Sequence, residues 1–228
     1  MEHFFLPEIQ DTFTVEGDTY RHLTRSRRMR LGERAVFCDG SGIDYLAKMT
    51  ACTKDTATFE VLERTPSVTE CPLKISLFQC LPKGDKMEEV LHRCTPLGIS
   101  RFIPVKSERS AEAPGENKRK RWEKIILSAA TQCGRSILPE LSSVLSFQEA
   151  IEEMKKANLA LICYENSEEP LPPLPQEGTL AVLIGPEGGL TPQEAESLPT
   201  CTLGRRILRT EEAAAFLMPI LLDRSGNL

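Results

Sequence analysis

Two kinds of hydrophobic patterning divide the chain near residue 70. Before this point, apolar positions form short strand-like runs separated by turn residues, as over 34–38, which Asp39-Gly40-Ser41-Gly42 follows. Further strands are predicted over 44–49 and 56–62, the second of which is rich in Thr, Val and Phe. We therefore expect residues 1–70 to form a small β-barrel or sheet domain.

From Pro72 onward the pattern alternates between strands and helices. Strands are predicted over 73–80, 99–105, 159–164 and 179–185. The last two are near-continuous apolar runs, which are typical of strands buried on both faces of a parallel sheet.

Helices are predicted where apolar residues recur at helical spacing behind a capping residue. Asp85 opens one helix, with Glu88 as its expected capping-box partner. The other predicted helices span 116–133 or begin at Ser146, at Thr191 and near Thr210. The alternation indicates an α/β domain with a mostly parallel sheet over residues 71–228.

Composition places the chain among globular proteins. Of 228 residues, 40% are apolar and 27% charged, which excludes a disordered or collagen-like chain. The start of the chain does not resemble a signal peptide, and the longest apolar run, 213–222, is too short to cross a bilayer. The sequence does not support a zinc site or metal catalysis, because its eight cysteines form no Cys-x-x-Cys pair and it has only three histidines. We expect a soluble, cytoplasmic protein without a metal.

Charge is distributed unevenly along the chain. The net charge is −5, so a nucleic-acid partner must be met by a local basic patch. Residues 21–30 contain no acid and five arginines, namely Arg21, Arg25, Arg27, Arg28 and Arg30. This segment suggests contact with a phosphate backbone. A second basic cluster, 118–121, is on charge alone equally well a solvated helix face.

Three segments that end predicted strands are candidate ligand loops: 81–88, 184–189 and 203–211. In open α/β sheets, ligands bind outside the carboxyl ends of the strands. The glycine loop 185–189 fits neither the dinucleotide fingerprint nor the P-loop pattern, so neither site is indicated. Considered singly, this loop is also explained as a plain strand-to-helix turn, and the arginines of 205–209 as a solvated charge cluster.

Together with Gln132-Cys133-Gly134-Arg135, these three loops closely resemble the ribosomal RNA small subunit methyltransferase E family. That family comprises bacterial 16S rRNA N3-uridine methyltransferases of the SPOUT superfamily. The runs 22–33 and 39–42 look like its PUA-like RNA-binding domain. The resemblance covers nearly the whole chain in order.

The resemblance implies an S-adenosylmethionine-dependent enzyme with a C-terminal trefoil-knotted α/β fold. It implies a homodimer that acts on 16S rRNA of the small ribosomal subunit. The residues expected at the cofactor are Tyr164, Ile184, Gly185, Glu187, Gly188, Gly189, Leu203, Gly204, Ile207, Leu208 and Thr210. Lys83 and Lys86 join the five arginines as expected RNA contacts.

The chemistry requires alignment of the methyl group with uracil N3 and loss of the N3 proton. We take Glu211 as the candidate general base, and Arg209 as the group that stabilises charge on the uracil carbonyl oxygens. Glu211 is equally well explained as a cap of its own helix.

Three residues depart from the family pattern. Pro96 and Glu212 replace the usual Glu and Thr, and Pro219 falls inside the final helix, where a kink is expected. Glu212 and Pro219 support an alternative function, a catalytically inactive RNA-binding or ribosome assembly factor of the same fold.

Overall fold

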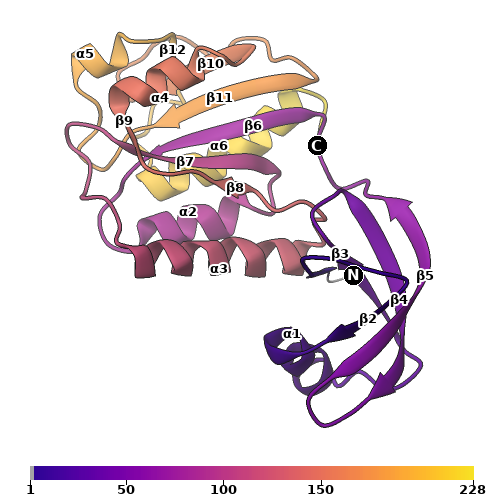
Figure 1. Cartoon of the computed structure of the whole chain (residues 1–228). Coiled ribbons are helices and arrows are strands. Elements are labelled where there is room, and N and C mark those ends of the chain that lie inside the picture. The colour runs from indigo at the N-terminus through magenta and orange to yellow at the C-terminus, as the bar shows by residue number, and fades with distance from the viewer. Residues whose placement is uncertain (1–2) are drawn as a thin grey trace. The chain divides into compact units, whose positions relative to one another are not determined.

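The computed structural model describes residues 3–228, which group into two compact units (Figure 1). The first unit contains the described residues up to Glu70 together with Leu127–Leu138, and the second contains Cys71–Ile126 and Pro139–Leu228. The predicted division into domains 1–70 and 71–228 differs from these units in the stretch 127–138. That residues 1–70 and 71–228 form separate domains stays a prediction.

The first unit is built on a five-stranded sheet with the order β1-β3-β4-β5-β2. Its strands are β1 (His3–Phe5), β2 (Thr12–Val15), β3 (Arg34–Cys38), β4 (Ile43–Cys52) and β5 (Ala57–Pro66). β1 and β3 pair in parallel, and the other pairs are antiparallel. Phe13, Phe37 and Phe59 pack in its core, with ring centroids 4.8–5.7 Å apart.

A helical segment that the strand pattern did not predict interrupts this unit. It consists of α1 (Gly17–Arg21) and the π-helical turn η1 (His22–Ser26). Tyr20 and Leu23 are buried, and the Tyr20 hydroxyl donates to the Thr53 and Lys54 carbonyls at 2.8 and 2.9 Å. These two anchors explain why a segment this short, and rich in arginine, holds a helical conformation.

The second unit contains a seven-stranded sheet in which all the recorded pairs are parallel. The strand order is β12-β10-β11-β6-β7-β8, and β9 also pairs with β7. The strands are β6 (Leu73–Cys80), β7 (Ile99–Lys106), β8 (Glu140–Leu141), β9 (Leu145–Ser146), β10 (Leu159–Cys163), β11 (Gly178–Ile184) and β12 (Thr200–Cys201). The prediction of an α/β domain with a mostly parallel sheet is confirmed. The trefoil knot stays a prediction.

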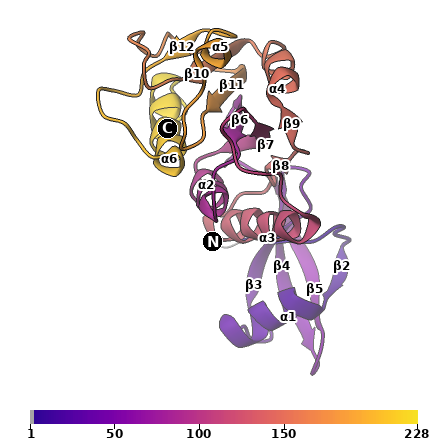
Figure 2. The same ribbon diagram turned by 90° about the vertical axis from the view of Figure 1, so that its left-hand side faces the viewer.

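Alternating side chains of the central strands bury both faces of this sheet. Leu73, Ile75 and Leu77 of β6 pack in one core cluster, while Phe78 and Cys80 pack in another. The helices are α2 (Lys86–Cys94), α3 (Glu116–Cys133), α4 (Phe147–Met154), α5 (Pro192–Ala195) and α6 (Thr210–Arg224). α2 and α6 contribute to the first cluster and α4 contributes to the second. The sheet therefore lies between α2 and α6 on one face and α4 on the other (Figure 2).

The predicted helix starts at Asp85, Ser146 and Thr191 are confirmed, but the capping box expected at Asp85 is wrong. Ser146 and Thr191 each accept a hydrogen bond from the backbone N–H of a glutamate three residues on. At α2, however, the Asp85 side chain makes no capping bond. Glu88 instead turns inward, where its Oε2 lies 2.7 Å from Arg121 Nη2. An ion pair with a neighbouring helix has replaced the local cap.

Helices α2 and α6 accommodate two of the residues that depart from the family pattern, Pro96 and Pro219. α2 ends at Cys94, two residues before Pro96. Pro96 has no backbone N–H to continue the helical hydrogen bonds, although Thr95, which precedes it, still has helical backbone angles of φ −58° and ψ −50°. α6 runs from Thr210 to Arg224 with Pro219 inside it. No helix in the described part of the chain is both long and apolar enough to span a membrane.

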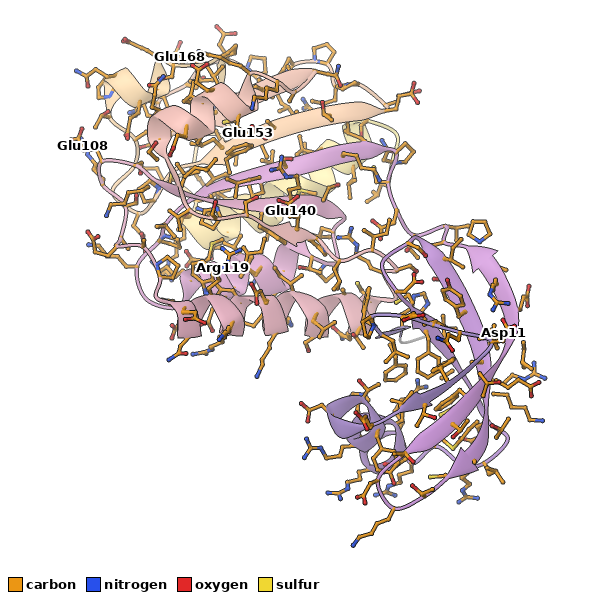
Figure 3. The ribbon with its side chains drawn as sticks, viewed as in Figure 1. Asp11, Glu108, Arg119, Glu140, Glu153 and Glu168 are labelled. Atoms are coloured by element: carbon orange, nitrogen blue, oxygen red, sulfur yellow. The ribbon has the colours of Figure 1, made fainter. Side chains whose placement is uncertain are left out.

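The basic cluster 118–121 makes contacts within the second unit. Arg119 donates to the Leu141 and Ser142 carbonyls at 2.6 and 2.7 Å (Figure 3). Lys120 pairs with Glu116 at 2.6 Å. These contacts favour the structural interpretation of the cluster over a nucleic-acid contact.

Candidate active site

Segments that follow β10, β11 and β12 surround one cavity of about 290 Å³ in the second unit. β10 and β11 are direct neighbours in the sheet, and β12 pairs with β10. The cavity therefore opens at the carboxyl ends of adjacent parallel strands, where a ligand site is expected.

Most residues expected at the cofactor line this cavity: Tyr164, Ile184, Gly185, Glu187, Gly189, Leu203, Gly204, Ile207, Leu208 and Thr210. Arg209 also lines it, whereas Gly188 and Glu211 do not belong to its lining. Pro186, Arg205 and Arg206, which lie in the predicted ligand loops 184–189 and 203–211, also line it, and the lining residues that were not predicted are Cys163, Glu165, Thr202 and Ala213. They flank the predicted positions, so they belong to the same three segments. Cofactor binding by these residues stays a prediction.

A buried glutamine connects two of these segments. Gln79, at the end of β6, is fully buried, and its Nε2 donates to Thr210 Oγ1 at 2.8 Å. The Thr210 hydroxyl donates in turn to the Gly185 carbonyl at 2.7 Å. The start of α6 is thereby held against the glycine loop. Gln79 was not predicted as a site residue, although it is the only amide side chain in β6.

The glycine loop is a tight turn that excludes side chains. Gly189 has φ +68°, and a Cβ there would lie 2.4 Å from Glu165 Oε1. A Cβ on Gly188 would lie 3.1 Å from Arg109 Cβ, and Arg109 Nη1 donates to the Gly188 carbonyl at 3.0 Å. Gly188 therefore faces Arg109, which explains why it is absent from the cavity wall.

Glu187 connects the glycine loop to the segment before α2. Its carboxylate accepts from the Lys83 backbone N–H at 3.0 Å and from Lys86 Nζ at 2.9 Å. Burial opposes ionisation, but these hydrogen bonds prevail and lower the pKa of Glu187. The hydrogen bond with Glu187 raises the pKa of Lys86, and the charge of Glu211 adds a smaller effect in the same direction. Lys86 thus has a partner within the site, whereas the Lys83 side chain is exposed.

The third loop segment around the cavity, residues 202–209, begins with a polar hydrogen-bonding residue and continues with exposed residues. Thr202 Oγ1 accepts from the Gly204 N–H at 3.1 Å, and Gly204 has φ +115°. Ile207 is 85% exposed. The apolar Ile207 side chain at the cavity is therefore accessible to solvent.

Two consecutive glutamates at the start of α6 differ in their roles. The Glu212 carboxylate accepts from the Arg209 backbone N–H at 3.4 Å and so caps the start of the helix. Glu211 is 5% exposed, and its Oε2 has no hydrogen-bond partner within residues 3–228. The capping role proposed for Glu211 therefore belongs to Glu212. An orphaned buried carboxylate oxygen calls for another explanation, such as a catalytic one.

The five arginines expected to bind RNA come from α1, η1 and the turn after them, and all five are exposed. Arg21 forms an ion pair with Asp18. The Arg27 guanidinium lies 5.8 Å from the Phe4 ring centroid. Arg28 has φ +52°, a left-handed conformation that projects this residue from the turn. Lys83 and Lys86 belong to the second unit. No cluster of three or more His, Cys, Asp or Glu in the described residues could hold a metal.

Comparisons with known proteins agree with this architecture. A family model described as an RNA methyltransferase domain matches residues 69–222, and an RNA methyltransferase PUA domain matches residues 15–62. Ribosomal RNA small subunit methyltransferase E of Bacillus subtilis is 33% identical over 225 residues, which cover 91% of this chain and 88% of that protein.

Two solved structures resemble the chain over nearly its whole length. Ribosomal RNA small subunit methyltransferase E from Neisseria gonorrhoeae, bound to S-adenosylmethionine, has a TM-score of 0.89 and 32% identity and covers 98% of this chain and 97% of its own. A Legionella pneumophila methyltransferase in complex with S-adenosylmethionine has a TM-score of 0.88 and 26% identity, with coverages of 97% and 96%. The expected fold class, a PUA-like domain followed by a SPOUT-type α/β domain, is confirmed.

Proposed function

The chain belongs to the RNA methyltransferase family that includes ribosomal RNA small subunit methyltransferase E, and we propose that it transfers a methyl group from S-adenosylmethionine to N3 of one uridine in 16S rRNA of the small ribosomal subunit. The observation that carries this proposal is the cavity at the ends of β10 and β11, with Arg209 in its wall and the buried Glu211 beside it.

The cavity suits S-adenosylmethionine in size and in the chemistry of its lining. Its volume of about 290 Å³ is at the lower end of the ~300–1,000 Å³ range of small-molecule sites. Ile184, Leu203 and Leu208 supply apolar surface for an adenine ring. Main-chain groups of the loops at Gly185 and Gly204 are available to the polar atoms of the nucleoside. The bound cofactor supplies an electrophilic methyl group on a sulfonium sulfur.

Glu211 is the general base in this proposal. Its Oε2 is buried and has no hydrogen-bond partner among the described residues 3–228, so it is available to accept the N3 proton of the uracil. Glu212 already fills the cap of α6, which leaves Glu211 without a structural task at the helix start. Arg209, on the exposed side of the same turn, donates to a uracil carbonyl oxygen as negative charge develops there.

The first unit holds the RNA through its arginine segment. The segment 21–30 presents five exposed cations, which suits phosphate contacts. They are Arg21, Arg25, Arg27, Arg28 and Arg30. The target uridine is drawn out of its stack to reach the cavity, as bases modified by other enzymes are. Lys83 and Lys86 contact the RNA near the cavity.

The protein works as a homodimer in the cytoplasm in this proposal. The exposed Ile207 and Phe216 side chains, 85% and 50% accessible, give the second unit apolar surface that a second copy can cover. The alternative, a catalytically inactive assembly factor, is not favoured. The departures that suggested it, Glu212 and Pro219, leave the cap and the continuity of α6 intact.

The test is transfer of labelled methyl from S-adenosylmethionine to unmodified small ribosomal subunits, followed by nucleoside analysis. We expect N3-methyluridine at one equivalent per subunit. Cofactor binding without transfer to subunits would contradict the proposed substrate. Absence of both binding and transfer would support the assembly factor.

A further inference from the structure

Two cysteines face each other at the edge of the cavity. Cys163 ends β10 and Cys201 ends β12, and the two are direct partners in the parallel register of these strands. Their Sγ atoms lie 3.9 Å apart, within hydrogen-bonding distance for thiols. Cys163 lines the cavity, whereas Cys201 is fully buried behind it. Neither thiol has a part in the proposed methyl transfer.

The backbone places this pair at a separation that suits a disulfide. Neighbouring strands lie about 4.7–4.9 Å apart, and disulfides join Cα atoms roughly 4.4–6.8 Å apart. Closing the 3.9 Å between the sulfurs to a bond of about 2.05 Å requires rotation of the side chains, while the strands keep their register.

The pair also differs chemically from the other buried cysteines. The hydrogen bond between the two thiols raises the pKa of Cys163 and lowers that of Cys201, although burial opposes the latter effect. Burial raises the pKa of Cys38, Cys80 and Cys94 to about 12. Because the thiolate is the reactive form, these three thiols are protected, whereas the shared hydrogen bond stabilises the thiolate form of Cys201.

We propose that Cys163 and Cys201 form a redox-modification site, which hydrogen peroxide converts to a disulfide that weakens ligand binding in the cavity. One thiolate attacks a peroxide oxygen, which gives a sulfenic acid and hydroxide. The second thiol attacks that sulfur, and water leaves as the S–S bond forms. The two cysteines lose two electrons and two protons in total, and one peroxide becomes two waters.

The disulfide acts on the cavity through the residues next to each cysteine. Tyr164 and Thr202 follow Cys163 and Cys201 and line the cavity, and the Tyr164 N–H donates to the Cys201 carbonyl at 3.1 Å. Drawing the sulfurs together reorients side chains at both walls. By thermodynamic linkage, a ligand that binds the reduced form better must also shift the dithiol–disulfide equilibrium toward the reduced form. The identity of that ligand, S-adenosylmethionine, rests on the proposed function.

The modification itself is tested by peptide mapping of the peroxide-treated full-length chain. A glutamate-specific protease separates the cysteines into peptides 154–165 and 197–211, which trypsin would leave on one peptide. We expect the two peptides to be joined, with a mass lower by two hydrogens, and released by dithiothreitol. Oxidation that modifies only the exposed Cys52 and Cys133, without this crosslink, would overturn the proposal.

The effect on the cavity is tested by S-adenosylmethionine titration before and after peroxide. We expect affinity about tenfold weaker after oxidation and restored by dithiothreitol. Cys163→Ser and Cys201→Ser should each abolish the change in affinity, while the matched variant Cys52→Ser should keep it. An unchanged affinity in the crosslinked protein would overturn the regulatory step. Reduced protein that never binds S-adenosylmethionine would contradict the proposed function and that step with it, and the crosslink would still decide the modification site.

Discussion

The Gln79 side chain donates to the hydroxyl of Thr210, 131 residues further along the chain, across a distance of 2.8 Å. Because Thr210 donates to the Gly185 carbonyl at 2.7 Å, one amide fixes the direction of the hydroxyl proton and with it the contact between α6 and the glycine loop. Arg209 and Glu211 flank Thr210 directly. The position of the proposed base therefore depends on a residue outside the cavity.

Replacing Gln79 with Leu should destabilise the fold and impair the site together. The loss of a buried hydrogen-bond partner costs about 1–3 kcal/mol. Urea unfolding measures this loss. Methyl-transfer kinetics should show a higher KM for S-adenosylmethionine, because the Gly185 segment lines the cavity. The exposed Gln148 offers a matched control, since Gln148→Leu should change stability by less than about 0.5 kcal/mol. Equal effects of the two substitutions would contradict a positioning role for Gln79.

The two glutamates of α6 provide a direct test of the base. Glu211→Gln should lower kcat by about 10²–10⁴-fold, because the amide cannot accept the N3 proton. Calorimetric titration should show little change in cofactor affinity. Glu212→Gln is the matched control, since glutamine can also close a capping box and should leave turnover close to that of the unmodified chain. Near-normal turnover in the Glu211→Gln variant would exclude the base role.

Glu187 should make the stability of the second unit sensitive to acid. Its pKa lies below the ordinary value of 4.5, so on acidification the unfolded chain takes up a proton before the folded one. The stabilising contribution is complete above that value and is lost as the pH falls through the folded pKa. Glu187→Gln cannot titrate there. Urea unfolding at about pH 5 and about pH 3 should therefore show a smaller loss of stability in the variant. An identical loss of stability in both proteins would show that ionisation of the Glu187 carboxylate does not contribute to the pH dependence of stability.

Charge reversal in the arginine segment should weaken RNA binding without affecting the cofactor. Arg25 and Arg28 suit this test, because Arg21 and Arg27 also contact Asp18 and Phe4. The double variant Arg25→Glu and Arg28→Glu should bind small-subunit RNA less tightly. Its log affinity should also depend less steeply on log salt, by about 2 units of slope.

Filter binding over a series of salt concentrations measures both quantities. Lys155→Glu, at an exposed lysine at the end of α4, should leave the slope unchanged. If the double variant methylated subunits normally and had an unaltered slope, the arginine segment would not be the RNA contact.

Local signals in the sequence determined the elements and the place of the site. The near-continuous apolar run 179–185 predicts a strand buried on both faces, and in the structure Leu180 and Val182 pack in one core cluster while Ala181 and Leu183 pack in the other. Ser146 and Thr191 predict where their helices begin, because a capping box joins residues only three positions apart. Likewise, glycine segments at strand ends predict loops at one edge of a parallel sheet.

Only the tertiary structure decided how these parts meet, because the decisive contacts join residues far apart in the chain. The sequence left Glu211 as either a cap or a base, and only the packing of α6 buries its side chain. The short helix at 17–26 depends on Tyr20 reaching the Thr53 and Lys54 carbonyls, which no local pattern encodes. Gln79 and the pair Cys163 and Cys201 acquire their partners only when β6, β10 and β12 are placed in the sheet.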